Sequence, residues 1–326
     1  MACESKKKFS SSRLFSKSMY DLAIPEDEFE SLPFRESDMD LCKTASTWVN
    51  YNKNLYPVNF RAPDETRVSV FSPSGEDIYV NGNYVTISPE EKINVIACQG
   101  TKSDTERDFW QMVLYNQVSV ILMLTGLSEN SKIKCSRYWP FPENSKSWPG
   151  SKPENDITVR SIFVEHPRPT VEIALLRVSQ GGRDTDVFHI YYKAWPDFGV
   201  PDSEEIRYVI SLFLSFWTDF SDPAVCHCSA GVGRTGTVLA ILRHLKTKES
   251  IVDIVRHLRH QRHGMVQTRE QYQFIKSFCE AKAVALGVSK VGAALGEAKS
   301  VALSGEDKAI ALGTGEDVKA FEVKIE

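Results

Sequence analysis

One segment, AVCHCSAGVGRTG at positions 224–236, constrains the fold of this chain more than any other. Residues 225–227 form a short apolar run that predicts a strand, and TGTVLAILRHL after it carries apolar residues at helical spacing. The loop between them therefore ends at a helix N-terminus, where N–H groups and the helix dipole favour an anion. Gly231 and Gly233 let the backbone curl, and Arg234 offers a planar fork for two oxygens of a tetrahedral oxyanion.

A thiol stands at the start of this loop. In the positive field of the loop the Cys228 thiol should ionise readily, and a thiolate at the floor of a phosphate site is a nucleophile directed at phosphorus. A redox CxxC pair is disfavoured because no second cysteine follows three residues away. Cys226, His227 and Cys228 have no matching pair at zinc-finger spacing, so we predict no metal and no cofactor. We interpret Cys226 as a small buried strand residue.

Bulk composition excludes several classes of protein. The chain has 326 residues, of which 42% are apolar and 25% charged, enough for a sizeable buried core. Its 39 basic and 43 acidic residues give a formal net charge of -4, which does not support nucleic-acid binding. Seven irregularly spaced cysteines are typical of the reduced thiols of a cytosolic or nuclear protein, and apolar runs of roughly ten residues are too short to span a bilayer. We therefore predict a cytoplasmic protein without a membrane span, and expect a monomer.

Amino-acid composition and hydrophobic patterning divide the chain into three parts. Residues 1–20 are rich in Ser and Lys and predict a flexible lead-in, whereas residues 21–284 are globular in texture. Residues 285–326 are almost all Ala, Gly, Ser, Lys, Glu and Val and predict a flexible tail. Strand and helix patterns alternate in the globular part, with Asp202 or Ser203 as the candidate cap of one helix and Ser250 as that of another. This rhythm predicts the α/β fold class.

The segment HCSAGVGRTG resembles the HCxxGxxR(S/T)G signature of the cysteine-dependent protein tyrosine phosphatases. Other segments that resemble the family run from about residue 35 to 284, among them DIYVNGNYV, ACQGT, DFWQMV and ENSKIKCSRYWP. The resemblance implies a classical tyrosine-specific, non-receptor catalytic domain, in which helices flank both faces of a central twisted, mostly parallel mixed sheet. It also implies a signalling enzyme that hydrolyses phosphotyrosine in proteins, its partners, in two steps through a cysteinyl phosphate on Cys228.

The match carries the family's roles onto the loop residue by residue. It implies that His227 orders the loop by hydrogen bonding. It also implies that Thr235 donates a hydrogen bond to the departing sulfur and so stabilises the returning thiolate. The expected phosphate-binding residues are Ser229, Ala230, Gly231, Val232, Gly233 and Arg234.

Two further segments resemble the family's acid loop and its water-binding segment. Asp197 in KAWPDFGVP would alone be an ordinary turn residue, but WPDFGVP resembles the mobile acid loop and implies a general acid, with Phe198 beside the substrate. HGMVQTREQYQF resembles the segment in which a glutamine holds the hydrolytic water, and implies this role for Gln267. An amide suits it because it donates and accepts without competing as a nucleophile. Asp197 would then act as the base on that water.

Selectivity for phosphotyrosine requires depth, because phosphotyrosine is longer than phosphoserine. NKNLYPVN resembles the family's phosphotyrosine-recognition loop and implies that Tyr56 forms a stacking wall. Leu55 stands where the family usually has Arg. Val58 and Asn59 stand where it has an Asp that binds the substrate backbone, so we expect Asn59 to substitute for it weakly.

Two charged residues in ENSKIKCSRYWP allow two interpretations. By the family match Lys134 lies near the acid loop and Glu129 contacts Arg234. Ordinary surface charges would explain both residues equally well.

Two other functions compete with this interpretation. A catalytically silent module would capture phosphotyrosine without turnover, but such proteins lose the nucleophile, the arginine or the acid, and this chain keeps Cys228, Arg234 and Asp197. A phosphoinositide phosphatase would favour Lys between the cysteine and the arginine, where this chain has only small uncharged residues. The sequence therefore favours a singly phosphorylated, flat substrate.

Overall fold

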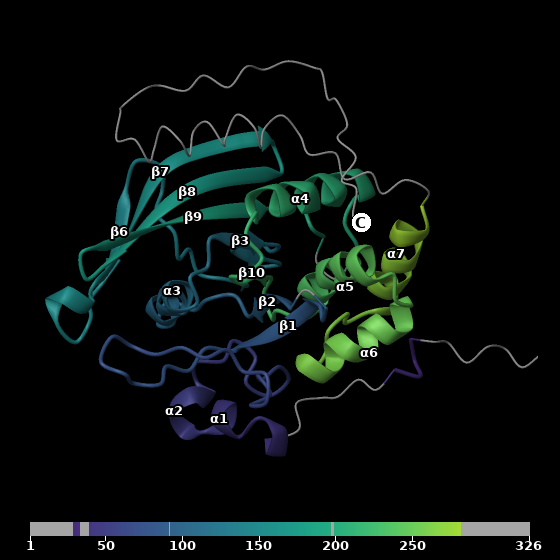
Figure 1. The fold of residues 1–326 in the computed structure, drawn as a ribbon, viewed down its shortest axis with the longest axis horizontal. Helices are drawn as coiled ribbons and strands as arrows, with labels where there is room; N and C mark the ends of the chain where they lie inside the picture. The colour runs from purple at the N-terminus through teal and green to yellow at the C-terminus, as the bar shows by residue number, and fades with distance from the viewer. Residues whose placement is uncertain (1–28, 33–38, 91, 197–198, 282–326) are drawn as a thin grey trace, which may run out of the picture.

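The computed structural model describes four segments, residues 29–32, 39–90, 92–196 and 199–281 (Figure 1). The predicted lead-in at 1–20 and tail at 285–326 lie outside the described residues, as do Asp197 and Phe198. Among the helices of these four segments, none is long and apolar enough to cross a membrane.

The described residues form one large sheet, a small two-stranded sheet and helices around them. The strands are β1 (Gly82–Ser88), β2 (Ile93–Cys98), β3 (Val120–Met123), β4 (Ser128–Glu129), β5 (Lys132–Ile133), β6 (Ser145–Trp148), β7 (Ile157–Arg168), β8 (Val171–Gln180), β9 (Arg183–Tyr192) and β10 (Ala224–His227). The helices are α1 (Lys43–Ser46), α2 (Trp48–Tyr51), α3 (Glu106–Tyr115), α4 (Ser203–Phe216), α5 (Gly233–Thr247), α6 (Ile251–Gln261) and α7 (Arg269–Glu280), with 3-10 turns η1 (Met39–Leu41) and η2 (Pro153–Asn155). The strand order of the large sheet is β1-β2-β10-β3-β9-β8-β7-β6.

The large sheet is mixed, and its antiparallel pairs outnumber its parallel ones. β10 pairs in parallel with β2 and β3, and β3 with β9, whereas the other four neighbouring pairs are antiparallel. The α/β class and the mixed central sheet are confirmed, but the prediction of a mostly parallel sheet is wrong. The reason is a meander: residues 157–192 form three long strands joined by short turns, which can connect only antiparallel neighbours. Gly181 and Gly182, with φ of 59° and 74°, form the second turn and were its sequence signal.

Each face of the sheet has its own apolar core. Along β2, Val95 and Ala97 join the core that includes residues of α4 to α7, whereas Ile96 and Cys98 join the core that includes residues of α3. Helices therefore cover both faces, as predicted (Figure 1). Most residues of α5 are buried, so its N-terminus at Gly233 lies inside the protein, just beyond the end of β10.

Helix caps follow the chemistry of the sequence. The carboxylate of Asp202 accepts hydrogen bonds from the N–H groups of Glu204 and Glu205 at the start of α4. The hydroxyl of Ser250 accepts from the N–H of Asp253 at the start of α6. The caps at Asp202 and Ser250 are thus confirmed, because a cap depends only on neighbouring residues, whereas Ser203, the other candidate, is the first residue of α4.

Candidate active site

The candidate site lies at the carboxyl ends of the central, parallel strands of the large sheet. β2, β10, β3 and β9 are neighbours that run parallel, so the segments that follow them leave the sheet at the same edge. One is the signature loop, residues 228–234, and another is the stretch that contains Lys134. The stretch after β9 leads to the predicted acid loop. The segments that follow β10, β3 and β9 are far apart in the sequence, but they leave the sheet next to one another.

Arg262 holds the signature loop from behind. Its side chain is fully buried, and its Nε and Nη2 donate to the carbonyls of Gly231 at 2.8 Å and Ala230 at 3.0 Å. Nη1 and Nη2 also donate to the amide oxygens of Asn83 and Asn81. Arg262 was not among the predicted site residues, although the sequence holds a signal for it: Arg262 stands four residues after Leu258, where the apolar face of α6 would continue.

Two other groups bind the carbonyls of Cys228 and Ser229, which precede those bound by Arg262. Gly100 N–H donates to the carbonyl of Ser229 at 2.7 Å, and the Nδ1 of His227 lies 3.1 Å from the carbonyl of Cys228. With the two bonds from Arg262, four consecutive carbonyls are bound from outside the loop. In a trans peptide the N–H points opposite to the C=O, so the N–H groups of residues 229–232 point into the loop. Such a ring of N–H groups at a helix N-terminus is built to bind an anion.

Only glycine fits at position 231. Its φ is +70°, and a Cβ there would lie 2.0 Å from the carbonyl oxygen of Cys98. The predicted curl of the loop at Gly231 is therefore enforced by conformation and by space. Gly233 begins α5 with a φ outside this left-handed range, and a Cβ there would lie 3.1 Å from the Oε1 of Gln267.

Cys228 lies at the base of the ring of N–H groups and is 4% exposed. Thr235 is buried in the first turn of α5 and directly follows Arg234. The predicted bond from Thr235 to the sulfur stays a prediction. Burial raises the pKa of Cys226 well above its usual value, so this neighbour stays a protonated thiol, in agreement with its interpretation as a buried strand residue.

Arg234 is held in a fixed orientation by Glu129. Its Nη1 and Nη2 donate to the two carboxylate oxygens of Glu129 at 2.6 and 2.8 Å. Burial alone would raise the pKa of Glu129, but the hydrogen bonds and charge of Arg234 outweigh it and lower that pKa to about 2. The Nζ of Lys134 lies 3.7 Å from the same carboxylate. The predicted contact between Glu129 and Arg234 is confirmed, and neither Glu129 nor Lys134 is an ordinary surface charge.

His227 is fully buried beneath the loop. Its Nε2 lies 2.8 Å from the hydroxyl of Tyr138, which also lies 2.8 Å from the Nε2 of His189. Because Nδ1 of His227 faces the carbonyl of Cys228, His227 is placed where it can order the loop as predicted. Burial lowers the pKa of His227 to about 4 and that of His189 well below its usual value.

Stability should depend on pH through His227. An unfolded histidine binds a proton below about pH 6.5, whereas the buried one does so only below about 4. Between these values the unfolded chain binds more protons, so the free energy of unfolding decreases as the pH is lowered from 6.5 to 4. The contribution, about 3 kcal/mol, is fully present above pH 6.5 and lost at pH 4.

Urea unfolding between pH 7.5 and 4.5 measures this dependence. The half-exposed His166 provides the control, since His166→Gln should retain the parent's slope. A free energy of unfolding that stays constant across this range would contradict the assignment.

The recognition loop, residues 52–60, lies against the signature loop. The hydroxyl of Tyr56 is 2.8 Å from the Oγ of Ser229, which also donates to the carbonyl of Lys134 at 2.9 Å. The ring of Tyr56 packs edge-to-face with Phe60 at 6.1 Å. Asn59 is exposed, and its backbone N–H donates to the carbonyl of Tyr56 at 3.3 Å. The structure thus brings Tyr56 to the phosphate-binding residues and leaves Asn59 on the surface.

Gln267 lies next to the start of α5. Its Oε1 is within contact distance of Gly233, and its N–H donates to the Oε1 of Gln271 at 2.9 Å. The same oxygen of Gln271 accepts from the N–H of Thr268, so Gln271 closes a capping box on α7. Gln267 is therefore beside the signature loop, as its predicted role requires, and Gln271 holds its backbone there.

The acid loop is described only on its flanks. Trp195 is buried, and its Nε1 donates to the carbonyl of Gly199 at 3.1 Å across the two undescribed residues. The N–H of Gly199 donates to the carbonyl of Pro196 at 3.2 Å. The predicted roles of Asp197 and Phe198 fall outside the described residues and stay predictions.

Comparisons with known proteins agree with this geometry. A family model described as protein-tyrosine phosphatase matches residues 50–280. The chain is 34% identical over 265 residues to tyrosine-protein phosphatase non-receptor type 13 of Mus musculus, and this match covers 78% of this chain and 10% of that protein. It is 37% identical over 265 residues to the non-receptor type 20 protein of Rattus norvegicus, and this match covers 77% of this chain and 56% of that protein. The chain therefore spans about a tenth and about half of these relatives.

Solved structures give the same result. A structure of PTPN18 in complex with HER2 phosphopeptides has a TM-score of 0.65 and 28% identity, and the match covers 72% of this chain and 83% of that chain. A second PTPN18 structure has a TM-score of 0.66 over 73% and 85% of the two chains. The likeness extends over most of the part of the chain that the structure describes.

Proposed function

The chain belongs to the protein-tyrosine phosphatase family, and we propose that it hydrolyses phosphotyrosine in proteins through a cysteinyl-phosphate intermediate. One observation carries the proposal. Four consecutive carbonyls of the signature loop are bound from outside, so the N–H groups around Cys228 point toward the position of a bound phosphate. Arg234, held by Glu129, adds a fork for the phosphate oxygens. Both groups stabilise the negative charge of the transferring phosphoryl group.

The first step forms the bond from sulfur to phosphorus. The Cys228 thiolate attacks, the ester bond breaks, and the tyrosyl oxygen leaves with a proton supplied by Asp197. In the second step a water held by Gln267 attacks phosphorus, Asp197 takes its proton, and the thiolate departs with a hydrogen bond from Thr235. Inorganic phosphate and the free enzyme result. The positions of Gln267 and Thr235 beside the loop support these roles.

Phosphotyrosine-containing proteins are the substrates we propose. Support comes from Tyr56, whose hydroxyl meets Ser229 and whose ring can line the path to the loop. PTPN18, to which this chain is similar, has been solved with HER2 phosphopeptides. We also propose a cytoplasmic location, because no disulfide joins the cysteines in the described segments.

Three substrates compared side by side test the function. Reduced, purified protein should hydrolyse a phosphotyrosyl peptide far faster than a phosphoseryl peptide or a phosphoinositide. Binding of the phosphotyrosyl peptide without turnover would instead indicate a silent capture module. Comparable rates on all three substrates would refute selectivity for tyrosine.

A further inference from the structure

Gln99, the residue after β2, joins the recognition loop to the sheet. Its Oε1 accepts from the N–H of Leu55 at 2.7 Å, and its Nε2 donates to the carbonyl of Lys53 at 2.9 Å. One amide therefore pairs with two backbone groups two residues apart, as a neighbouring strand would do. Gln99 is only 7% exposed, so these bonds are shielded from water.

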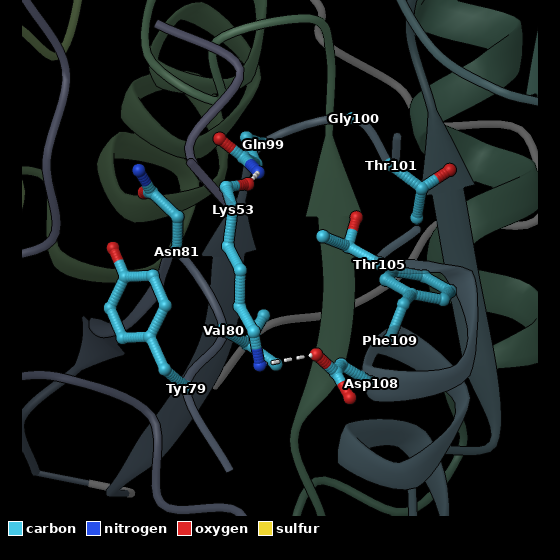
Figure 2. Close-up of a pocket in the computed structure, with 10 residues that line it drawn as sticks. All are labelled: Lys53, Tyr79, Val80, Asn81, Gln99, Gly100, Thr101, Thr105, Asp108 and Phe109. Carbon is cyan, nitrogen blue, oxygen red and sulfur yellow. Dashed lines mark hydrogen bonds and ion pairs between the residues drawn. The ribbon is translucent and has the colours of Figure 1, made fainter. Parts of the chain in front are cut away.

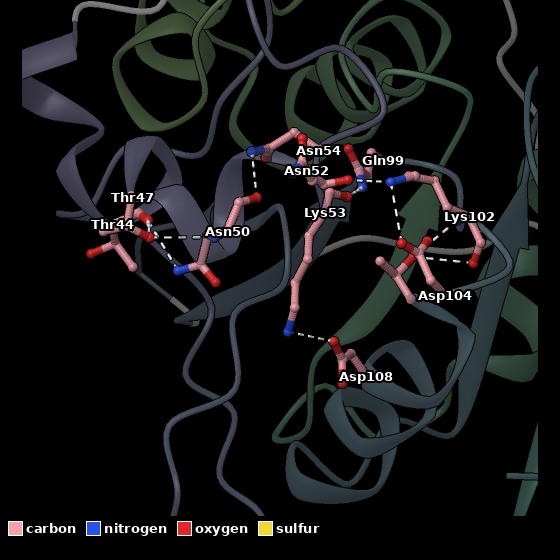
Figure 3. A network of polar contacts seen from close by, with 11 residues as sticks. Thr44, Thr47, Asn50, Asn52, Lys53, Asn54, Gln99, Lys102, Asp104 and Asp108 are labelled. Atoms are coloured by element: carbon pink, nitrogen blue, oxygen red, sulfur yellow. Dashed lines mark hydrogen bonds and ion pairs between the residues drawn. The ribbon is translucent and has the colours of Figure 1, made fainter.

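Two other contacts tie the same loop to the segment after Gln99 (Figure 3). The Nζ of Lys53 lies 2.8 Å from Asp108, and the Nζ of Lys102 donates to the carbonyl of Asn52. Both lysine side chains are about 30% exposed, and an exposed charge pair such as that of Lys53 with Asp108 contributes about 0 to 1 kcal/mol. The buried amide of Gln99 is therefore the stronger attachment.

The packing beneath the loop is incomplete at this point. A small cavity of about 20 Å³, room for one water, lies between Gln99, Lys53 and Phe109 (Figure 2). The ion pair of Lys53 with Asp108 of α3 lies at the side of this cavity. The hydrogen bonds of Gln99 to Lys53 and Leu55 thus position this part of the loop, while Asn81 binds the side chain of Asn54 and the carbonyl of Phe60 farther along it.

The next residue binds the signature loop. Gly100 N–H donates to the carbonyl of Ser229 at 2.7 Å, and a Cβ on Gly100 would lie 2.7 Å from the carbonyl of Lys134 and 3.1 Å from that of Cys228. Gln99 and Gly100, adjacent in the chain, therefore hold the two loops at one fixed separation. A second link runs from Asn54 and Phe60 through Asn81 to Arg262. The contact of Tyr56 with Ser229 joins the two loops directly, and one such bond contributes about 1 kcal/mol.

We infer that Gln99 is a positioning residue for substrate selectivity, which holds Tyr56 at the height above Cys228 that admits phosphotyrosine and excludes phosphoserine. The inference rests on the proposed function. It follows from the two bonds of Gln99 to the recognition loop and the bond of Gly100 to the signature loop. Inorganic phosphate needs the signature loop alone, whereas a phosphotyrosyl peptide needs both loops in register.

Gln99→Glu is the sharpest test, because glutamate has the same shape. It keeps an acceptor for the N–H of Leu55 but turns a second acceptor toward the carbonyl of Lys53. We expect KM for a phosphotyrosyl peptide to rise about tenfold, the effect of one lost buried hydrogen bond, with a much smaller change in kcat. The ratio of kcat/KM for phosphotyrosyl over phosphoseryl peptide should fall by a similar factor. The inhibition constant of inorganic phosphate should change by less than about twofold, since a shift of that size is under 0.5 kcal/mol.

Gln111→Ala is the matched control. Gln111 is equally buried, and its amide also makes two hydrogen bonds, to the carbonyl of Phe71 and with Gln180. This variant should lower Tm without changing the selectivity ratio. Lys102→Ala, which removes the exposed contact, should change the ratio by less than about threefold.

Two outcomes for Gln99→Glu would overturn the inference: an unchanged selectivity ratio, or weaker binding of inorganic phosphate in proportion to the peptide. If the parent protein does not turn over phosphotyrosine, the proposed function fails instead. Calorimetry then still tests Gln99, because the ratio of the dissociation constants for phosphotyrosyl peptide and inorganic phosphate should rise in the variant. An unchanged ratio would refute the positioning role by itself.

Discussion

Cys228→Ser should lower kcat on a phosphotyrosyl peptide by about five to six orders of magnitude, while the peptide still binds with affinity close to the parent's. A serine hydroxyl is not ionised at neutral pH, and no general base is positioned for it in the proposed mechanism. The phosphate-binding groups do not depend on the sulfur. Arg262 and Gly100 hold the loop, and Glu129 holds Arg234.

Steady-state kinetics and calorimetry on the same preparation separate the two effects. Cys279→Ser, on the half-buried face of α7, is the matched control and should retain the parent's kcat. Rapid acid quench of the parent during turnover should trap a phosphocysteine that Cys228→Ser lacks. Substantial turnover by Cys228→Ser would mean that the nucleophile lies elsewhere, and loss of peptide binding would mean that the sulfur supports the loop.

The second large effect concerns the acid. Asp197→Ala should lower kcat on a phosphotyrosyl peptide by about two to four orders of magnitude, the usual contribution of a general acid. The loss arises because tyrosinate is a poor leaving group without a proton. The thiolate and the phosphate site are unchanged, so the variant should bind substrate and retain it.

Leaving-group dependence identifies the role of Asp197. The loss should be much smaller with 4-nitrophenyl phosphate, whose leaving group departs without a proton. Asp197→Asn, which keeps the shape but cannot supply a proton, should match Asp197→Ala. Asp219→Ala provides the control, since Asp219 is exposed and accepts from the N–H of Ser221 within its own turn. If Asp197→Ala were nearly as fast as the parent on an aryl phosphate with a poor leaving group, another residue must be the acid.

Local patterns were predicted well. The strand before Cys228, the helix after it and the caps at Asp202 and Ser250 all agree with the structure. Each depends on residues within one or two turns of one another, which hydrophobic period and cap chemistry describe. The contact between Glu129 and Arg234 was also predicted, but from the family resemblance rather than from local pattern.

The arrangement of the sheet was predicted less well. Alternating strand and helix patterns favoured parallel neighbours, whereas residues 157–192 form an antiparallel meander. The Gly181–Gly182 turn was the local signal for it. The spacing of apolar residues identifies a strand but not its neighbour in the sheet, because strand pairing depends on the path of the whole chain.

By itself, the sequence determined the chemistry of the site: a thiol, glycines and a guanidinium within seven residues, between a strand and a helix, leave little choice but an oxyanion-binding loop. Only the tertiary structure decided what holds that loop in shape. Arg262 and Gly100 bind its carbonyls from other segments, and Gln99 sets its distance from Tyr56. These partners come together because β2, β10 and α6 meet in space. The spacing of apolar residues along the sequence does not predict that these elements become neighbours, because their arrangement results from the packing of both apolar cores.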